Sequence, residues 1–150
     1  GSIYETPFNM IIFLESLFKK LKKIKSVCLI IDYAKNKNFG NSLKSIKKHE
    51  IINPLDMIGK SDISTHVNFN LIKKISKKFN LICNGPINQR NFLIKLGILL
   101  RAEILMRNAD SKQKKMLKNG LDFLINKNKM GKIFNVISIS NKKINNLIGF

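Results

Sequence analysis

Ser26-Val27-Cys28-Leu29-Ile30-Ile31-Asp32-Tyr33 is the stretch that decides the fold of this 150-residue chain. Five apolar residues follow one another without polar alternation, β-branched side chains dominate, and an acidic and an aromatic residue close the run. This pattern is typical of a strand buried on both faces of a parallel sheet. In open α/β sheets ligands bind outside the carboxyl ends of the strands, so Asp32 and Tyr33 are predicted to lie at such a rim. The structural alternative is a buried strand that simply ends in a turn.

Helical periodicity flanks this strand on both sides. Apolar side chains recur at helical spacing from Phe8 to Leu21, which predicts an amphipathic helix that leads into the strand. A second amphipathic helix is predicted to begin after Asn68, whose side chain can cap it, and to end before Asn80.

Two further strands are predicted from apolar runs. Residues 81–83 form one, which the turn-forming residues Asn84-Gly85-Pro86 are expected to stop. Residues 133–140 form the other because they are rich in β-branched side chains. Strand, helix and strand in succession over 26–83 predict a parallel unit with a right-handed crossover. The remaining helices are predicted to be capped by Asn88 and Ser111.

The hydrophobic pattern weakens between residues 34 and 62. Gly40-Asn41-Ser42 and Asn53-Pro54 are typical of turns, and residues 43–52 fit either extended chain or a short helix. Long irregular segments inside a compact domain are usually functional or form a small excursion of their own. We therefore interpret residues 34–62 as an insertion over the strand tips.

The composition favours a soluble single domain spanning residues 3–140. Residues 1–2 are interpreted as the remnant of a removed tag and residues 141–150 as a flexible tail. The net charge is +19, but 25 of the 28 basic residues are lysines spread over every predicted helix, so a solvated basic coat is favoured over a nucleic-acid surface. No apolar run is long enough for a membrane span. Cys28 and Cys83 lie in predicted strands, which favours free thiols in a reducing compartment over a disulfide.

Motifs that announce a particular chemistry are missing from the sequence. No two glycines have the spacing of a dinucleotide-binding or P-loop phosphate cradle, so the sequence predicts no cofactor-binding residue in this chain. His49 and His66 are far apart and have no clustered cysteine or carboxylate, so no metal site is predicted. Seven polar residues cluster near predicted strand tips and are the candidate site residues, although each is also suited to capping or closing a turn. They are Asp32, Tyr33, His49, Asp62, Thr65, His66 and Gln89.

Taken together, these segments resemble the second half of the MidA family, a family of S-adenosylmethionine (SAM)-dependent methyltransferases that includes the mitochondrial arginine methyltransferase needed for assembly of respiratory complex I. Each matching segment is short, and it is their order and spacing that make the resemblance specific. The segments are Ile31-Asp32-Tyr33, Gly40-Asn41-Ser42-Leu43, His49, Asn53-Pro54-Leu55, Gly59, residues 62–69, Gly85-Pro86-Ile87-Asn88-Gln89, Phe92-Leu93, Gly97-Ile98, Arg101, Met130-Gly131, Phe134 and Val136.

The sequence departs from the family pattern at four positions. The family usually has glycine at Ala34, aspartate at Asn41, threonine at Ser42 and aspartate at Asn68. Asn68 keeps the capping chemistry and Ser42 keeps the hydroxyl. The departures therefore bear mainly on the charge at Asn41 and on backbone freedom at Ala34.

The resemblance implies an α/β fold, namely the carboxyl-terminal part of a Rossmann-like, seven-stranded class I methyltransferase sheet with helical insertions and an antiparallel last strand. By this resemblance residues 133–140 lie between the other two strands and antiparallel to both. The family's glycine-rich SAM loop and acidic ribose ligand precede the point where this chain begins. The strand over 26–33 would then lack a neighbour on one side, and we expect it to self-associate or to pair with a partner chain.

The resemblance also implies a function, that of a SAM-dependent protein arginine methyltransferase whose substrate is an arginine-containing protein, in the bacterial cytoplasm or the mitochondrial matrix. The fragment alone is expected to be inactive. Two alternatives stay open: a non-catalytic assembly protein that retains the fold, and a lysine-rich nucleic-acid binder. Asp32, Asp62 and His66 are predicted to be catalytic, and Tyr33, His49, Thr65 and Gln89 to bind substrate.

Overall fold

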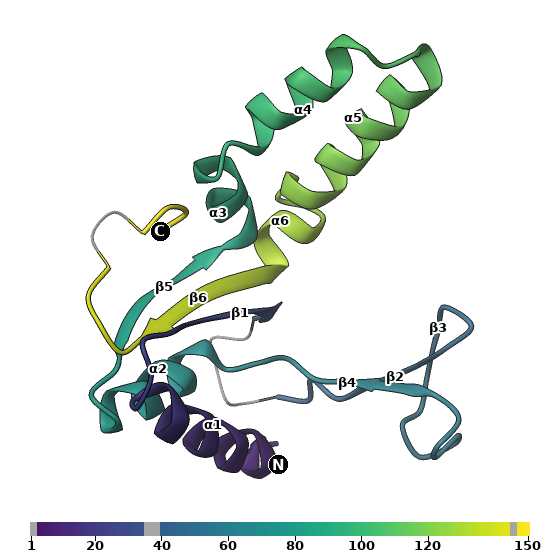
Figure 1. Cartoon of the computed structure of the whole chain (residues 1–150). Coiled ribbons are helices and arrows are strands. Elements are labelled where there is room, and N and C mark those ends of the chain that lie inside the picture. The colour runs from purple at the N-terminus through teal and green to yellow at the C-terminus, as the bar shows by residue number, and fades with distance from the viewer. Residues whose placement is uncertain (1–2, 35–39, 145–146) are drawn as a thin grey trace.

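The computed structural model describes residues 3–34, 40–144 and 147–150 (Figure 1). Within them the strands form two separate three-stranded antiparallel sheets, combined with helices in a mixed α/β fold. The predicted tag remnant (1–2) and part of the predicted insertion (35–39) lie outside the described residues. In chain order the elements are α1 (Phe8–Leu21), β1 (Val27–Tyr33), β2 (Lys44–Lys47), β3 (Glu50–Ile52), β4 (Asp62–Ser64), α2 (Phe69–Lys78), β5 (Ile82–Asn88), α3 (Gln89–Lys95), α4 (Ile98–Arg107), α5 (Ser111–Ile125), α6 (Met130–Ile133) and β6 (Phe134–Ser140).

The main sheet has the strand order β1-β6-β5. β6 pairs antiparallel with β1 from Val27↔Ser140 to Tyr33↔Phe134, and antiparallel with β5 on its other side. The predicted place of residues 133–140, between the other two strands and antiparallel to both, is therefore confirmed. β1 and β5 run in the same direction, so their carboxyl ends lie at the same end of the sheet, where α3 begins (Figure 1). The seven-stranded sheet is not seen in the part of the chain that the structure describes.

The core lies between one face of this sheet and the helices α1 and α2, which cover that face (Figure 1). Phe18 of α1 and Phe69 of α2 are fully buried against Ile137 and Ile139 of β6. Phe18 also meets Phe79 edge to face, with ring centroids 6.2 Å apart, a favoured aromatic geometry. α2 is capped as predicted, because the Asn68 side chain accepts a hydrogen bond from the Leu71 N–H at 3.0 Å.

The other face of β1 is open, and the expectation that this strand is buried on both faces is wrong for the chain as described. Burial alternates along β1, and Val27, Leu29 and Ile31 are each 45–50% exposed. The reason is position: β1 is the edge strand of the main sheet, and both helices of the core lie on its opposite face. An apolar run records a preference for burial, but what covers a strand is set by its neighbours.

β5 is longer than predicted, because Asn84-Gly85-Pro86 does not stop it. The strand continues to Asn88 through an irregularity between Asn84 and Ile87, where its register against β6 shifts. Gly85 has a φ of +95°, and a Cβ there would lie 2.8 Å from the Val136 carbonyl oxygen. Glycine and proline here form a bulge in the strand, which is one of the places where a sheet accepts them.

The predicted insertion contains the second sheet, with the strand order β3-β2-β4. Of the two alternatives for residues 43–52, the extended one is confirmed as a β2–β3 hairpin. Its two-residue turn is Lys48-His49, both at positive φ, the geometry that suits the right-handed twist of a hairpin. This small sheet projects away from the main sheet as an arm (Figure 1).

The helices α4 and α5 form a projecting pair on the side opposite to α1 and α2 (Figure 1). Gly97, at a φ of +83°, separates α3 from α4. The cap of α5 is Asp110 and not Ser111 as predicted, because Asp110 and Gln113 bond to each other's backbone N–H groups in a capping box. The α3 cap is Asn88, as predicted.

Beyond β6 the chain ends near α3, where the Phe150 ring lies 5.3 Å from that of Phe92. The flexibility of residues 141–150 stays a prediction, and 145–146 lie outside the described residues. Within the described ranges, no helix combines the length and the apolar character that crossing a membrane requires.

Candidate functional site

The carboxyl end of β1 is joined to the segment that follows the arm. Ala34 and Val67 form a parallel bridge, and the Val67 N–H donates to the Tyr33 carbonyl oxygen at 2.8 Å. This pairing holds residues 65–67 against the end of β1, so Thr65 and His66 are brought to the rim where Asp32 and Tyr33 already lie. The sequence predicted these four residues as site residues without predicting the bridge that gathers them.

Three aromatic side chains lie together at this rim. The Tyr33 ring lies over the His66 imidazole in a stacked arrangement, with centroids 6.4 Å apart and planes 24° apart. The Tyr33 ring also contacts Phe134, with centroids 4.1 Å apart and planes tilted by 39°. Tyr33 is 38% exposed and His66 is exposed as well, so the rings offer flat π surface to a ligand. Such surfaces attract a guanidinium or another planar cation.

Asp32 supplies a carboxylate at the same end of β1, and its side chain lies on the sheet face opposite to the Tyr33 ring because successive strand residues alternate between the faces. Its Oδ1 accepts the Tyr33 N–H at 2.7 Å, and the side chain is half-buried. In the sheet Asp32 stands opposite Asn135 of β6, which in turn stands opposite Asn88 of β5. This end of the sheet, where β1 and β5 finish, therefore carries one polar residue on each of the three strands.

The backbone of His66 is held by a buried hydroxyl. The Ser42 Oγ accepts the His66 N–H at 3.1 Å and lies 2.9 Å from the Glu5 carboxylate, to which it donates. Ser42 is 4% exposed, so this chain of bonds is shielded from water and fixes His66 relative to the start of the arm. The role of Glu5 was not predicted, and the signal for Ser42 was the hydroxyl that the family pattern keeps at this position.

The other predicted site residues are more scattered. Asp62 is exposed in β4, opposite Ile46. His49 lies in the hairpin turn at the far end of β2 and is not brought to the rim (Figure 1). Gln89 follows β5 at the same sheet edge, but its amide donates to the Leu124 carbonyl oxygen at 2.9 Å, which ties α3 to the end of α5.

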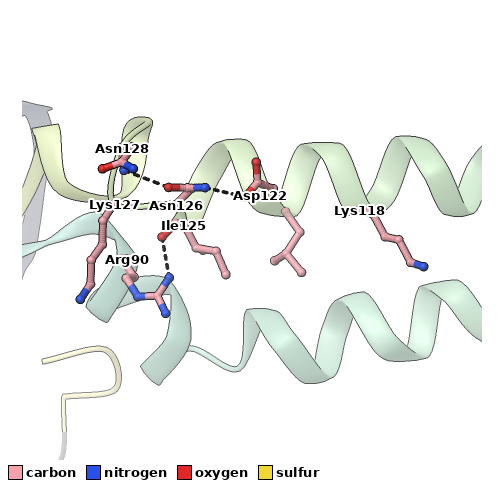
Figure 2. Close-up of a pocket in the computed structure, with 8 residues that line it drawn as sticks. Arg90, Lys118, Asp122, Ile125, Asn126, Lys127 and Asn128 are labelled. Carbon is pink, nitrogen blue, oxygen red and sulfur yellow. Dashed lines mark hydrogen bonds between the residues drawn. The ribbon is translucent and has the colours of Figure 1, made fainter.

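A cavity of about 570 Å³ lies between the start of α3 and the last turns of α5 (Figure 2). Arg90 lines it, and its Nη1 donates to the Ile125 carbonyl oxygen at 2.8 Å, which fixes the plane of the guanidinium. Asp122 accepts hydrogen bonds from Asn126 and Lys129, and these bonds lower the pKa of its carboxyl. No local sequence pattern predicts this groove, because Arg90 is 28 or more positions away from its other lining residues.

The thiols offer no activated nucleophile. Cys28 and Cys83 are free and half-buried, and each stands opposite Ile139, one on either side of β6. They are two strand spacings apart, roughly 9.5 Å, which is beyond the Cα separation of a disulfide. Burial raises the pKa of both thiols, and at Cys83 nearby Lys73 and Lys77 oppose the shift. Among the described residues no three His, Cys, Asp or Glu side chains gather as metal ligands.

The fold defines a mixed α/β protein, and comparison with known proteins gives its family. The sequence profile described as "Putative S-adenosyl-L-methionine-dependent methyltransferase" matches residues 1–87. The chain belongs to this family, whose cofactor is SAM, and the resemblance to the MidA family is confirmed.

Relatives in animals match most of the chain. It is 30% identical over 130 residues to the mitochondrial protein arginine methyltransferase NDUFAF7 of Danio rerio, a match that covers 87% of the chain and 31% of that protein. The corresponding protein of Rattus norvegicus is 26% identical over 127 residues, covering 84% of the chain and 29% of the relative. The chain thus spans less than a third of the length of these relatives.

Two crystal structures from Burkholderia thailandensis share the fold. One, of an uncharacterized protein, has a TM-score of 0.79 at 23% identity and covers 90% of this chain and 37% of its own. The other, a candidate methyl transferase bound to S-adenosyl-homocysteine, has a TM-score of 0.77 at 23% identity and covers 90% and 36%.

The described glycines lie in several kinds of local structure. Gly85 lies in the β5 bulge and Gly97 lies between two helices. No glycine-rich loop joins a strand to a helix among them, which is where a methyl-donor nucleoside requires close backbone approach.

Proposed function

We propose that this chain is the carboxyl-terminal part of a SAM-dependent protein arginine N-methyltransferase that acts in respiratory complex I assembly, and that the rim of β1 forms the substrate-side wall of its site. The observation that carries the proposal is the match over 87% of the chain to a relative named as a protein arginine methyltransferase. That match covers 31% of the relative, which leaves the remaining length to supply the cofactor pocket.

The rim is suited to an arginine side chain. The rings of Tyr33 and His66 can stack on the planar guanidinium. Its N–H groups would be accepted by a carboxylate, for which we propose Asp32 from the end of β1 and Asp62 from β4 of the arm. Arginine is protonated at neutral pH, so a nearby carboxylate or imidazole is also needed to take the proton that leaves on methylation. Asp32, Asp62 and His66 are our proposed catalytic residues, and Tyr33 and Thr65 our proposed substrate contacts. His49 and Gln89 stay predicted substrate contacts, although neither is placed at the rim.

The open edge of β1 fits the same proposal. In the full enzyme this edge would pair with a further strand. Residues 3–140 would then be the carboxyl-terminal part of a seven-stranded methyltransferase sheet. In the isolated chain it would self-associate or take a partner strand, because unpaired N–H and C=O groups on an apolar edge attract another strand. Light scattering that gives a concentration-independent monomer, with β1 amides protected on both edges, would contradict this part of the proposal.

The proposal is tested with the full-length polypeptide that contains this chain, assayed for methyl transfer from SAM to an arginine peptide. Asp62→Asn should lower kcat at least tenfold, since it removes a charge-assisted hydrogen bond to the guanidinium. Asp56→Asn, an exposed aspartate in the loop before β4, is the matched control and should keep kcat within twofold.

SAM binding and circular dichroism should be the same for both variants. Equal kcat in Asp62→Asn and the control would remove Asp62 from the site. No methyl transfer by the unmodified polypeptide, combined with normal assembly of complex I, would favour the alternative of a non-catalytic assembly protein.

The names of the mitochondrial relatives support the mitochondrial matrix as the location, with the bacterial cytoplasm as the alternative.

A further inference from the structure

The groove between α3 and α5 is continued by a second cavity of about 310 Å³ around the start of α3. The two cavities share Arg90 and Lys127. Lys118 adds a third cation to the first cavity and Lys132 a fourth to the second, where Asn88 and Asn91 also line the wall. The two cavities are neighbours through Arg90 and Lys127, and their lining residues together are here called the basic groove.

The charges that line the basic groove are unbalanced. Asp122 is its one acidic residue among those that line either cavity, and it is occupied by Lys129 and Asn126. The guanidinium of Arg90 is half-buried and is held in place by its bond to the Ile125 carbonyl oxygen (Figure 2). An arginine has five N–H donors, so a guanidinium fixed through one of them is preorganised to bind a carboxylate with the others.

The neutral part of the lining favours a peptide over a nucleic acid. Four asparagines line the groove. The oxygen of Asn88 caps α3, and the amide of Asn126 is bonded to Asp122 and to the Asn128 N–H. The amide side chains of Asn91 and Asn128 are suited to donate to and accept from a peptide backbone. A phosphate backbone offers acceptors only. No aromatic side chain is among the residues that line either cavity, so unpaired bases would find no stacking surface there.

The basic groove lies at the same edge of the sheet as the rim. Asn88, which lines the second cavity, is in register with Asn135, and Asn135 with Asp32. Two strand spacings separate the backbone positions of Asn88 and Asp32, about 9.5 Å, and an extended peptide rises about 3.3 Å per residue. About three residues of extended chain therefore span from the rim to the groove.

We propose that the basic groove binds acidic residues of the protein substrate, three to four positions away from the arginine that occupies the rim. This inference rests on the proposed function and adds a substrate class to it, namely arginines flanked at that distance by aspartate or glutamate. Arg90, Lys127 and Lys132 bind the carboxylates. Asn91 and Asn128 bind the peptide backbone.

The inference is tested first by binding, without catalysis. The probe is a fluorescein-labelled peptide with one arginine and acidic residues at the third and fourth positions on either side, and it is compared with the same peptide carrying Asn and Gln in their place. The 150-residue chain should bind the acidic peptide at least tenfold more tightly at 150 mM salt, since several charge-assisted hydrogen bonds are lost in the neutral peptide.

Charge reversal locates the site on the surface. Lys127→Glu combined with Lys132→Glu should weaken binding of the acidic peptide at least tenfold. Lys112→Glu combined with Lys115→Glu changes the net charge by the same amount on exposed residues of α5 that line neither cavity, and should change binding less than twofold. Equal weakening by the two pairs would mean that only the overall charge matters and would overturn the inference.

The same variants are then assayed for methyl transfer in the full-length polypeptide. The groove pair should raise KM for the acidic peptide about tenfold and leave kcat unchanged. Selective binding of acidic peptide without any methyl transfer would uphold the basic groove and sink the proposed function. Methyl transfer with equal KM for acidic and neutral peptides would do the reverse. Tighter binding of a single-stranded RNA of equal charge, weakened by the groove pair, would assign the groove to nucleic acid and overturn the inference.

Discussion

The helices α1 and α5 are both amphipathic, yet only α1 encloses a core. α1 buries Leu14, Phe18 and Leu21 against the main sheet, whereas α5 has no buried residue and leaves Met116 66% exposed. The difference lies in what stands opposite each helix: α1 faces β6, while α5 packs mainly against α3, α4 and α6. Apolar content therefore predicts that a helix seeks a partner surface, and the topology decides whether the described chain provides one.

The largest effect is expected from a substitution in the core between α1 and the main sheet. Phe18→Ala removes a fully buried ring and should lower the free energy of unfolding by about 3–5 kcal/mol. Phe123→Ala removes a half-exposed ring from α5 and should cost less than about 1 kcal/mol. Urea titrations of the two variants measure the difference, and equal losses would contradict the placement of the core.

A pair of glycine substitutions gives effects of opposite sign. Gly85→Ala places a Cβ 2.8 Å from the Val136 carbonyl oxygen at a φ of +95°, and should destabilise the chain by roughly 2 kcal/mol. Gly120→Ala lies in α5 with no atom within 4 Å of the new Cβ, and should stabilise the helix by about 0.5–1 kcal/mol. Thermal unfolding followed by circular dichroism compares them. A Gly85→Ala variant as stable as the parent would show that β5 has no tight bulge.

The smallest effect concerns pH and sharpens the description of the core-facing thiols. Burial raises the pKa of Cys28 above its ordinary value of 9.0, so the folded state favours the protonated thiol. Stability from this group is therefore fully present below pH 9 and is lost as the pH rises through the folded-state pKa. In Cys83→Ser, alkylation of native Cys28 should keep accelerating above pH 9, whereas in 8 M urea it should level off near the ordinary pKa. Native and unfolded profiles that coincide would contradict the burial of Cys28.

Much of the main sheet could be predicted from the sequence because its signals are local. The apolar run at 26–33 and the β-branched run at 133–140 each predicted a strand within one residue of its observed bounds. Asn68 and Asn88 were predicted as caps because an asparagine before an amphipathic run is a local signal too. The central place of β6 came from the family resemblance, since strand order depends on pairings between distant residues.

The features that were predicted wrongly or not at all share a physical cause. Each depends on contacts between residues that are distant in the sequence. Asn84-Gly85-Pro86 has turn composition, but the neighbouring β6 holds it in a bulge. The exposure of Leu29 depends on what covers the sheet, and composition does not record that. At the candidate site, the contact of Tyr33 with His66 arises from the bridge between Ala34 and Val67, which no local pattern announces.

The place of β6 has a consequence for how the chain is made. The strand that joins β1 to β5 is the last of these three strands to be synthesised, and one of its pairs with β1, Val27 with Ser140, spans 113 residues. Until Ser140 has emerged, β1 and β5 have no common neighbour, and the strand edges that pair with β6 stay open to other chains. A translation stop before Phe134 would therefore remove the central strand of the main sheet. The product would have unpaired strand edges and would be prone to aggregation.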